Sequence, residues 1–281
     1  MRISVVVTTY NGKMHLEKQL LSLLQQERAP DEVLIFDDGS TDGTIELVQS
    51  FIRKNCLESW QFYVNAKRKG WKQNFMEGLR KAAGDILFPC DQDDIWYPRK
   101  LAEMTAVMEQ HPEIKLLACD YRVIYESGAL KATVYKKTPA ETQGLITRYG
   151  FTKHFFMNPY PGCTYAVRRD FFDAVKELWF DGSPHDEFLW LMAAVQDGAW
   201  FYNRVLMDYV RYSDNASGVR YKDVALQKEN LRYIHKQLCA LQSFAAEHPD
   251  AVPVERCKML AAAQIWCAKR QKLMETRKIG R

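Results

Sequence analysis

Hydrophobic and polar positions follow two different periods in the first 125 residues of the chain. Apolar runs at 3–7, 32–36 and 86–90, interrupted only by Ser4 and Glu32, are typical of strands that are buried on both faces of a parallel sheet. The segments between these runs carry apolar residues at helical spacing. Strands are expected over 3–7, 32–36, 61–64, 85–90 and 116–125, and helices over 15–24, 45–52, 72–83 and 98–110. This alternation predicts an α/β fold with a Rossmann-like, mostly parallel sheet flanked by helices.

The second half of the chain is less regular. The polar stretch 126–144 has no clear period and is expected to be a surface excursion. Strands are expected over 163–167 and 199–212, and helices over 145–157, 170–179, 185–195, 222–247 and 254–278. The pattern predicts one main domain over 1–218, with halves 1–120 and 121–218, and a helical C-terminal extension over 219–281.

An acidic cluster follows the strand expected over 85–90. Asp91, Gln92, Asp93 and Asp94 place three carboxylates within four residues. Like charges this close repel one another and raise each other's pKa values. A hard divalent cation such as Mg²⁺ or Mn²⁺ would compensate them, because it prefers oxygen ligands. For an isolated motif of this kind, the alternative is a solvated acidic turn.

Polar residues end two further strands of the expected sheet. They occupy 8–11 and 37–42, as the acidic cluster occupies 91–94. In open sheets of this type, ligands bind outside the carboxyl ends of the strands. Three polar strand ends together therefore favour a binding site over a solvated turn.

The charge of the chain is unevenly distributed. The net charge is +4, but residues 253–281 alone hold eight Lys and Arg against two Glu, which leaves the rest of the chain slightly acidic. This basic segment favours contact with an anionic membrane surface, and no nucleic-acid partner is expected. On a helical wheel Met259, Ala263, Trp266 and Leu273 fall on one arc of the last helix. A helix packed on the body or on a second subunit is therefore the alternative.

The sequence contains no apolar run of about 18 residues, and its N-terminal apolar run is too short for a signal peptide. A cytoplasmic location is expected, with peripheral attachment to the inner face of the cell membrane as an addition. The seven cysteines are scattered, odd in number and without a CxxC pair. This usage favours reduced thiols and argues against a zinc site.

Several of these segments, in this order, resemble the inverting glycosyltransferases of family 2, which have the GT-A fold. The resemblance covers about residues 1–215, and the form Asp-Gln-Asp-Asp-Ile-Trp with a later His-Asp is most similar to the rhamnosyltransferase-like subgroup. That subgroup serves bacterial surface polysaccharides such as lipopolysaccharide and capsule. The matching segments are 6–12, 35–44, 65–70 with Asn74, 91–96, 162–164 and 185–186.

The resemblance implies a UDP- or dTDP-sugar donor. Thr8, Tyr10 and Asp38 would line the pocket for the base, and Asp38 would accept the imide N–H of uracil or thymine. One residue of the basic run 67–69, with Arg68 as the candidate, would contact the base or a phosphate. Gln92 is placed with these donor contacts.

The resemblance also implies roles for the acidic cluster and for a later aspartate. Asp93 would bind Mn²⁺ or Mg²⁺ directly, and Asp91 would contact the ribose or a metal-bound water. Asp94 would support these residues or cap the next helix. Asp186 would be the general base that removes a proton from a hydroxyl of a glycan or lipid-linked acceptor. Glu187 is the alternative base, and His185 is expected to be structural or to position the acceptor.

One segment departs from the subgroup. A Tyr-Arg-x-His pattern is usual there, whereas this chain has Tyr209, Val210, Arg211 and Tyr212. Arg211 could supply the phosphate contact after a shift of one residue. A nucleotide-sugar-binding partner that has lost its chemistry is therefore an alternative function. A sugar nucleotidyltransferase is a further alternative, although the Gly-rich, Arg-containing loop of that class does not follow the first strand.

Overall fold

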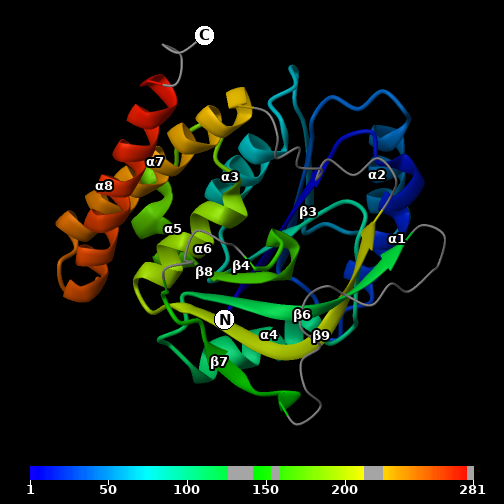
Figure 1. Cartoon of the computed structure of the whole chain (residues 1–281). Coiled ribbons are helices and arrows are strands. Elements are labelled where there is room, and N and C mark those ends of the chain that lie inside the picture. The colour runs from blue at the N-terminus through cyan, green and yellow to red at the C-terminus, as the bar shows by residue number, and fades with distance from the viewer. Residues whose placement is uncertain (126–141, 153–158, 212–223, 277–281) are drawn as a thin grey trace.

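The computed structural model describes residues 1–125, 142–152, 159–211 and 224–276, and the side chains of all of these except 224–227 and 276. The chain forms one nine-stranded sheet in the order β3-β2-β1-β4-β8-β6-β9-β5, with β7 paired to β9. The sheet and its flanking helices are shown in Figure 1. The strands are β1 (Ile3–Thr9), β2 (Glu32–Asp37), β3 (Trp60–Val64), β4 (Ile86–Cys90), β5 (Ile95–Trp96), β6 (Leu116–Tyr125), β7 (Ile146–Arg148), β8 (Tyr165–Arg168) and β9 (Ala199–Arg211).

The two faces of the sheet bury two separate hydrophobic clusters. On β1, Val6 belongs to one cluster, whereas Val5 and Val7 belong to the other, because successive side chains of a strand point to opposite faces. The helices α1 (Lys13–Leu24), α2 (Thr44–Lys54) and α4 (Lys100–Gln110) cover the face of Val5. The helices α3 (Trp71–Lys81), α5 (Arg169–Val175) and α6 (His185–Val195) cover the face of Val6. This layering confirms the α/β fold that the sequence predicts.

The parallel strands bring the predicted polar ends to one edge of the sheet. β1 pairs in parallel with both β2 and β4, and Thr9 lies opposite Asp37 while Val7 lies opposite Cys90. The residues that follow these three strands therefore meet in space. β8 pairs antiparallel with both β4 and β6, so the two halves of the chain share one continuous sheet.

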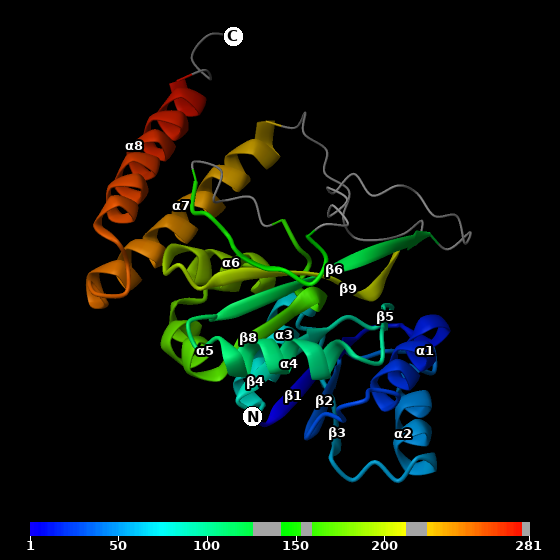
Figure 2. The same ribbon diagram turned by 90° about the horizontal axis from the view of Figure 1, so that it is seen from below.

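The C-terminal extension is part of the packed body. The helices α7 (Val224–Glu247) and α8 (Val254–Thr276) run side by side, as seen from two directions in Figures 1 and 2. Leu238 and Phe244 of α7 and Leu260 of α8 lie in the same buried cluster as Val6 and the α6 residues. Removal of the extension would therefore expose apolar core surface.

The helix predicted over 145–157 is wrong. The described part of this segment contains the strand β7, whose Ile146 lies opposite Tyr202 of β9, and residues 149–152 are not helical. The free edge of β9 supplies the hydrogen-bonding partner that short-range periodicity does not reveal. Residues 153–158, and positions 126–141 of the excursion predicted over 126–144, lie outside the described residues. The other predicted strands and helices are present, with ends that differ by a few residues.

Candidate active site

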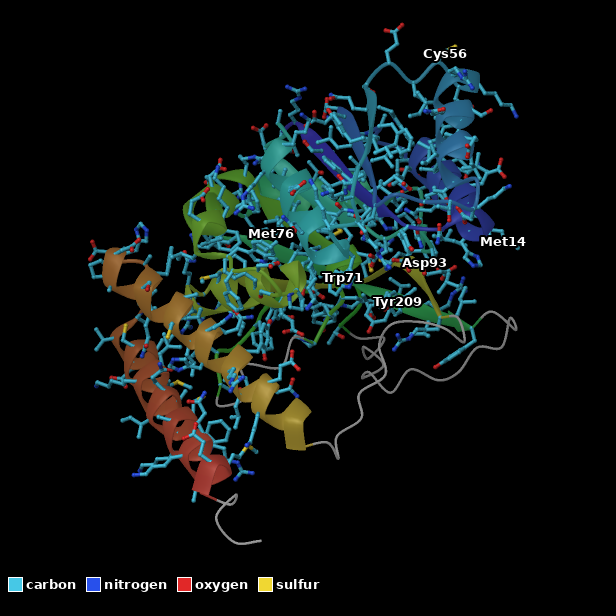
Figure 3. All side chains as sticks on the ribbon, turned by 90° about the horizontal axis from the view of Figure 1, so that it is seen from above. Met14, Cys56, Trp71, Met76, Asp93 and Tyr209 are labelled. Atoms are coloured by element: carbon cyan, nitrogen blue, oxygen red, sulfur yellow. The ribbon has the colours of Figure 1, made fainter. Side chains whose placement is uncertain are left out.

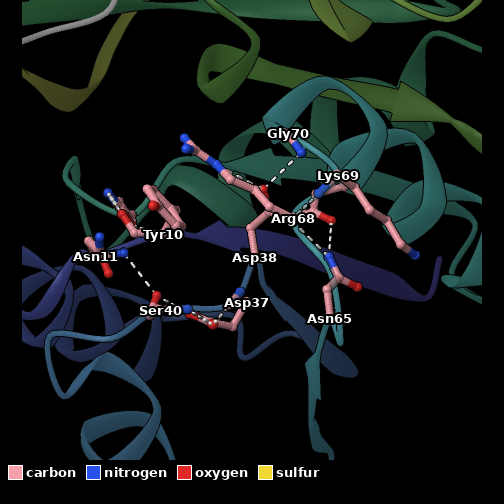
Figure 4. Close-up of polar contacts among 12 residues, drawn as sticks. Tyr10, Asn11, Asp37, Asp38, Ser40, Asn65, Arg68, Lys69 and Gly70 are labelled. Atoms are coloured by element: carbon pink, nitrogen blue, oxygen red, sulfur yellow. Dashed lines mark hydrogen bonds and ion pairs between the residues drawn. The ribbon is translucent and has the colours of Figure 1, made fainter.

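Asp38 is the centre of a polar network at the end of β2 (Figure 4). Its buried carboxylate accepts hydrogen bonds from the backbone N–H groups of Lys69 at 2.7 Å and Gly70 at 2.8 Å, and from the side chain of Asn65 at 3.1 Å. Gly70 has a φ of +86°, in the region that favours glycine. Asp38 thus holds the segment 65–70 against the sheet edge.

Arg68 and Tyr10 lie against this network. The Arg68 guanidinium stacks 3.9 Å from the centre of the Tyr10 ring, and its Nε lies 3.8 Å from Asp38. Both side chains are exposed, so the pair forms part of the surface of the site. Thr8 is buried within β1, one residue before its end. The structure therefore brings together Tyr10, Asp38 and Arg68, and places Thr8 beneath them.

Asp37 has a structural role beside Asp38. Its carboxylate accepts hydrogen bonds from the hydroxyl groups of Thr9 at 2.7 Å and Ser40 at 2.6 Å. It also accepts from the backbone N–H of Ser40 at 2.7 Å. These bonds fix the turn after β2, and as a result Asp38 is directed toward the 65–70 segment.

Gln92 connects the segments that follow β1 and β4. Its Oε1 accepts a hydrogen bond from the Tyr10 N–H at 2.9 Å, and its Nε2 donates to the Tyr10 carbonyl at 3.3 Å. A Cβ at Gly12 would lie only 2.3 Å from the same Oε1, so this contact requires glycine there. Gln92 therefore positions Tyr10 in the absence of a ligand.

The predicted ligand Asp91 gathers with Asp94 and Cys163, whereas the other predicted ligand, Asp93, is not in this group. Ligand atoms of Asp91, Asp94 and Cys163 all lie within 4.8 Å of one another. Burial, with added repulsion from Asp93 and Asp186, raises the pKa of Asp91 to about 7. Burial also raises the pKa of Asp93, and burial together with the charges of Asp91 and Asp93 raises that of Asp94 well above its ordinary value. The protein thus holds these carboxylates together against repulsion.

These residues fit a divalent cation. Oδ2 of Asp94 is buried and, apart from the Cys163 thiol, has no hydrogen-bond partner among the described residues. A cation would satisfy that oxygen and remove the repulsion that raises the carboxylate pKa values. Asp94 does not cap a helix, because its Oδ1 accepts the Val210 N–H at 3.3 Å and α4 begins only at Lys100.

Asp186 faces this cluster from the second half of the chain. It lies in the first turn of α6, and its Oδ1 accepts the N–H of Glu187 at 2.9 Å. Burial raises the pKa of Asp186, while backbone N–H groups, among them that of Gly162, and the charge of Lys72 oppose the rise. The charge of Asp186 helps to raise the pKa of Asp91. A Cβ at Gly162, next to Cys163, would lie 3.0 Å from the Cβ of Asp186, so Asp186 lies near the acidic cluster.

Glu187 points to a different partner. Its Oε2 accepts a hydrogen bond from the Tyr233 hydroxyl of α7 at 2.7 Å, and Gln237 donates to the same hydroxyl at 2.6 Å. This geometry favours Asp186 over Glu187 as the base. The sequence gives no signal for Tyr233, because it lies far along the chain in a helix outside the family resemblance.

His185, the first residue of α6, is buried against α3. Its ring stacks 4.0 Å from that of Phe75 and lies edge-on to that of Trp71 at 6.1 Å. Burial lowers its pKa to about 3, and neither ring nitrogen has a hydrogen-bond partner among the described residues. His185 is thus neutral, which fits the structural role that the sequence predicts and not an acid or base.

Arg211 and Tyr209 lie at the end of β9, beside the acidic cluster. The Arg211 guanidinium is 5.3 Å from the Tyr209 ring. Burial raises the pKa of Tyr209, and the charges of Cys163 and Asp91 add to the rise. In the view of Figure 3, the labelled side chains of Tyr209, Asp93 and Trp71 project onto the same part of the molecule. Tyr212 lies outside the described residues.

The comparisons with known proteins agree with this geometry. Residues 4–174 match the model of Glycosyl transferase family 2. The dTDP-rhamnosyl transferase RfbG of Shigella flexneri is 24% identical over 228 residues, which cover 75% of this chain and 73% of RfbG. The poly(ribitol-phosphate) beta-N-acetylglucosaminyltransferase TarS of Staphylococcus aureus is 28% identical over 158 residues, which cover 54% of this chain and 26% of TarS.

Solved structures show the same fold. A fragment of S. aureus TarS in complex with UDP-GlcNAc superposes with a TM-score of 0.66 at 18% identity, covering 88% of this chain and 72% of the fragment. The mannosyltransferase PcManGT of Pyrobaculum calidifontis, in complex with GDP-Man and Mn²⁺, gives a TM-score of 0.56 at 15% identity, covering 98% of this chain and 84% of that protein. From the family match over more than half of its length, together with the three strand ends and the facing aspartates, the chain belongs to glycosyl transferase family 2.

Proposed function

We propose that the chain is an inverting, metal-dependent glycosyltransferase that moves a sugar from a UDP- or dTDP-sugar to a glycan or lipid-linked acceptor. The observation that carries this proposal is that the charges of Asp93 and Asp186, from the two halves of the chain, both act on Asp91. The activities of the relatives RfbG and TarS support bacterial surface polysaccharide synthesis as the setting.

The residues divide the reaction between two sides of the site. Asp91 and Asp93 hold the cation, Mn²⁺ or Mg²⁺, which when bound would neutralise the charge that develops on the leaving diphosphate. Asp186 removes the proton from the acceptor hydroxyl as its oxygen attacks the anomeric carbon. Attack from the face opposite the leaving group inverts the configuration of that carbon. Arg211 supplies a positive charge near the phosphates.

The base pocket is formed by Tyr10, Asp38 and Arg68. In the proposed complex, Arg68 leaves the face of the Tyr10 ring, and the uracil or thymine ring stacks there. Asp38 can accept the imide N–H of the base, because in the described part of the chain its Oδ2 receives a single hydrogen bond, from Gly70, beside the ion pair with Arg68. Gln92 keeps Tyr10 in place for this stacking through the two bonds between them.

The proposal is tested by separating donor binding from turnover. Asp186→Asn should lower kcat by about 10² to 10⁴-fold, the usual contribution of a general base, and leave the Kd of UDP unchanged. Asp93→Ala should weaken Mn²⁺-dependent UDP binding as well as turnover. The readouts are nucleoside diphosphate release with a panel of UDP- and dTDP-sugars, and calorimetric titration of UDP with and without Mn²⁺. Full activity in either variant would contradict the assignment.

Two other functions predict different results in the same experiments. Metal-dependent UDP binding without turnover on any acceptor would indicate a binding partner that has lost its chemistry, as the segment around Val210 suggests. Pyrophosphate release from a nucleoside triphosphate would indicate a sugar nucleotidyltransferase.

An anionic membrane surface is the proposed location of the acceptor, with the chain on the cytoplasmic face. The outward face of α8 exposes Ile265, Trp266 and Leu273, with Lys258 and Lys269 exposed along the same helix. Among the described residues, no helix has the length and apolar content needed to cross a membrane. This face therefore suits a helix that lies on the lipid headgroups, with its lysines toward the anionic lipids.

The residues predicted to share one arc of α8 differ in their burial. Trp266 and Leu273 are more than half exposed, whereas Ala263 packs against the main core cluster. Met259 is half-buried. The packing alternative is thus correct for one part of the arc, and the membrane proposal rests on the exposed part alone.

A further inference from the structure

The acidic cluster contains a sulfur atom as well as carboxylates. Cys163 is 1% exposed, and its Sγ lies within 4.8 Å of ligand oxygens of both Asp91 and Asp94. Cys163 sits in a single 3₁₀ turn, Gly162–Thr164, directly before β8. Asp91 is only half-buried, so the group opens toward the surface on that side.

The position of Cys163 is fixed by a buried cation. Lys100 is fully buried, and its Nζ donates a hydrogen bond to the Cys163 carbonyl at 2.7 Å. The same ammonium group lies 3.3 Å from the Met207 sulfur and 4.3 Å from the centre of the Trp96 ring. The Thr164 hydroxyl adds a bond to the Pro161 carbonyl at 2.7 Å. The thiol is thus held in place before any ligand arrives, as metal ligands usually are.

A second observation points to a ligand at this place. Apart from the Cys163 thiol, Oδ2 of Asp94 has no hydrogen-bond partner among the described residues, although Asp94 is 1% exposed. A buried carboxylate oxygen without a partner is costly unless a cation or a donor satisfies it. Three ligand residues are also the number found in zinc sites that keep a fourth position open.

We propose that Cys163, with Asp91 and Asp94, forms a cation site that binds thiophilic divalent cations such as Zn²⁺ and Cd²⁺ through sulfur. Thiolate ligands favour these ions, whereas carboxylates alone suit Mg²⁺ and Mn²⁺. On binding, the S–H bond of Cys163 breaks, its proton passes to solvent, and a sulfur lone pair forms the bond to the cation, with no change of oxidation state. This inference rests on the proposed function, because the site shares Asp91 with the cation site proposed there. Zn²⁺ bound by Cys163 should therefore displace Mn²⁺ and inhibit transfer until a chelator removes it.

The experiment uses Cd²⁺, because a cadmium–thiolate bond gives a charge-transfer absorption in the ultraviolet. The background protein carries Cys56→Ser, Cys239→Ser and Cys257→Ser, which removes the cysteines that are not buried. Titration with CdCl₂, without any nucleotide, should produce the absorption with one cation per chain. Cys163→Ser in this background should abolish it and weaken Cd²⁺ and Zn²⁺ binding by about 10 to 100-fold, the usual effect of a lost site contact. The same variant should change the Kd of Mn²⁺ less than threefold.

Cys119→Ser is the matched control. Cys119 is also buried, and its Sγ lies 3.6 Å from the Lys100 ammonium, but it is outside the group of Asp91 and Asp94. This variant should keep the absorption. Asp94→Asn should keep a weaker absorption, because the sulfur remains while one carboxylate is lost. Circular dichroism and thermal melting show whether each variant is folded.

Absence of the absorption in the background protein would overturn the inference, and so would its persistence in Cys163→Ser. Neither readout involves a sugar donor or acceptor. A chain that binds Cd²⁺ through Cys163 but transfers no sugar would contradict the proposed function alone. A chain that transfers sugar but shows no cadmium–thiolate absorption would contradict this inference alone.

Discussion

His185 and Asp186 are adjacent in sequence, but their environments differ. His185 is buried against Phe75 and is neutral, with a pKa lowered to about 3. Asp186 faces the acidic cluster and interacts electrostatically with Asp91. The first turn of α6 therefore holds both a buried aromatic contact and the carboxylate proposed as the base. The packing of His185 fixes the orientation of α6 and, with it, the position of Asp186.

The protonation of His185 should affect stability in acid. In the unfolded chain the residue takes up a proton below its ordinary pKa of 6.5, but in the folded protein it stays neutral down to about 3. Its effect on stability is therefore absent above pH 6.5 and becomes more unfavourable as the pH falls toward 3. Between pH 7.5 and pH 5, this effect of His185 should lower the free energy of unfolding by about 2 kcal/mol.

The measurement compares urea unfolding of the wild type and His185→Phe at these two pH values. Phenylalanine can keep the stacking on Phe75 but cannot take up a proton. Because the acidic cluster is present in both proteins, its own pH dependence cancels in the comparison. An equal loss of stability in both proteins on acidification would contradict the assignment.

Gly162 should tolerate no side chain. An added Cβ would lie 2.5 Å from Nε2 of His185 and 3.0 Å from the Cβ of Asp186. Gly162→Ala should therefore displace the base, lower kcat at least about tenfold and cost about 1 to 3 kcal/mol of stability. Gly150→Ala is the control, because a Cβ there meets no atom within 4 Å. Steady-state kinetics and thermal unfolding test both variants, and normal turnover in Gly162→Ala would exclude the expected displacement.

At the scale of elements, α7 supports α6 next to the catalytic residue. Tyr233 donates its hydroxyl to Glu187, and this bond lowers the pKa of Glu187 against the rise that burial causes. Gln237 and Ser183 complete the network around the same hydroxyl. The extension therefore fixes the side chain adjacent to the proposed base.

Tyr233→Phe should raise the pKa of Glu187, so that Glu187 is neutral over a wider range of pH. Because the two carboxylates repel each other, the pKa of Asp186 should then fall and the acidic limb of the pH profile of kcat should move to lower pH. The variant should also lose about 1 to 3 kcal/mol of stability, because a buried carboxylate loses its donor. Tyr63→Phe serves as the control, since its hydroxyl bonds only to Gln61 at the surface. An unchanged pH profile in Tyr233→Phe would restrict the network to a structural role.

The sequence predicts the features that depend on neighbouring residues, and it does not predict those that depend on contacts between distant segments of the chain. The strands β1, β2 and β4 and the acids that follow them are visible locally, because apolar runs define the strands and parallel pairing aligns their ends. The contacts of Cys163 and Tyr233 with the site are not visible, because they form between segments far apart in the chain. The strand β7 was missed for the same reason, since its partner is the edge of β9.

At the scale of the whole molecule, the exposed face of α8 predicts binding to anionic membranes. The triple variant Trp266→Ser, Lys269→Gln and Lys272→Gln should abolish flotation with vesicles that contain phosphatidylglycerol. The two lysines alone account for about 2 kcal/mol, or roughly a thirtyfold change in affinity. Point substitutions are preferable to a deletion, because Leu260 of the same helix belongs to the core.

The control for this experiment changes the same residue types on the opposite side of the sheet. Met14→Ser, Lys18→Gln and Lys54→Gln remove one exposed apolar side chain and two exposed lysines from α1 and α2. This variant should bind vesicles like the wild type. Equal loss in both triple variants would indicate a general charge effect and not a membrane-binding face.

The position of β8 in the middle of the sheet has a consequence for synthesis of the protein. β4 can pair with β8 only after the ribosome has made residues 165–168, and β6 can pair with β9 only after residues 199–211. Until then, the nascent N-terminal strands have an open edge, which is a hazard for aggregation. Pairing across such long separations also slows folding. The yield of folded protein should therefore depend on chaperones and on a low growth temperature more than on the final stability of the fold.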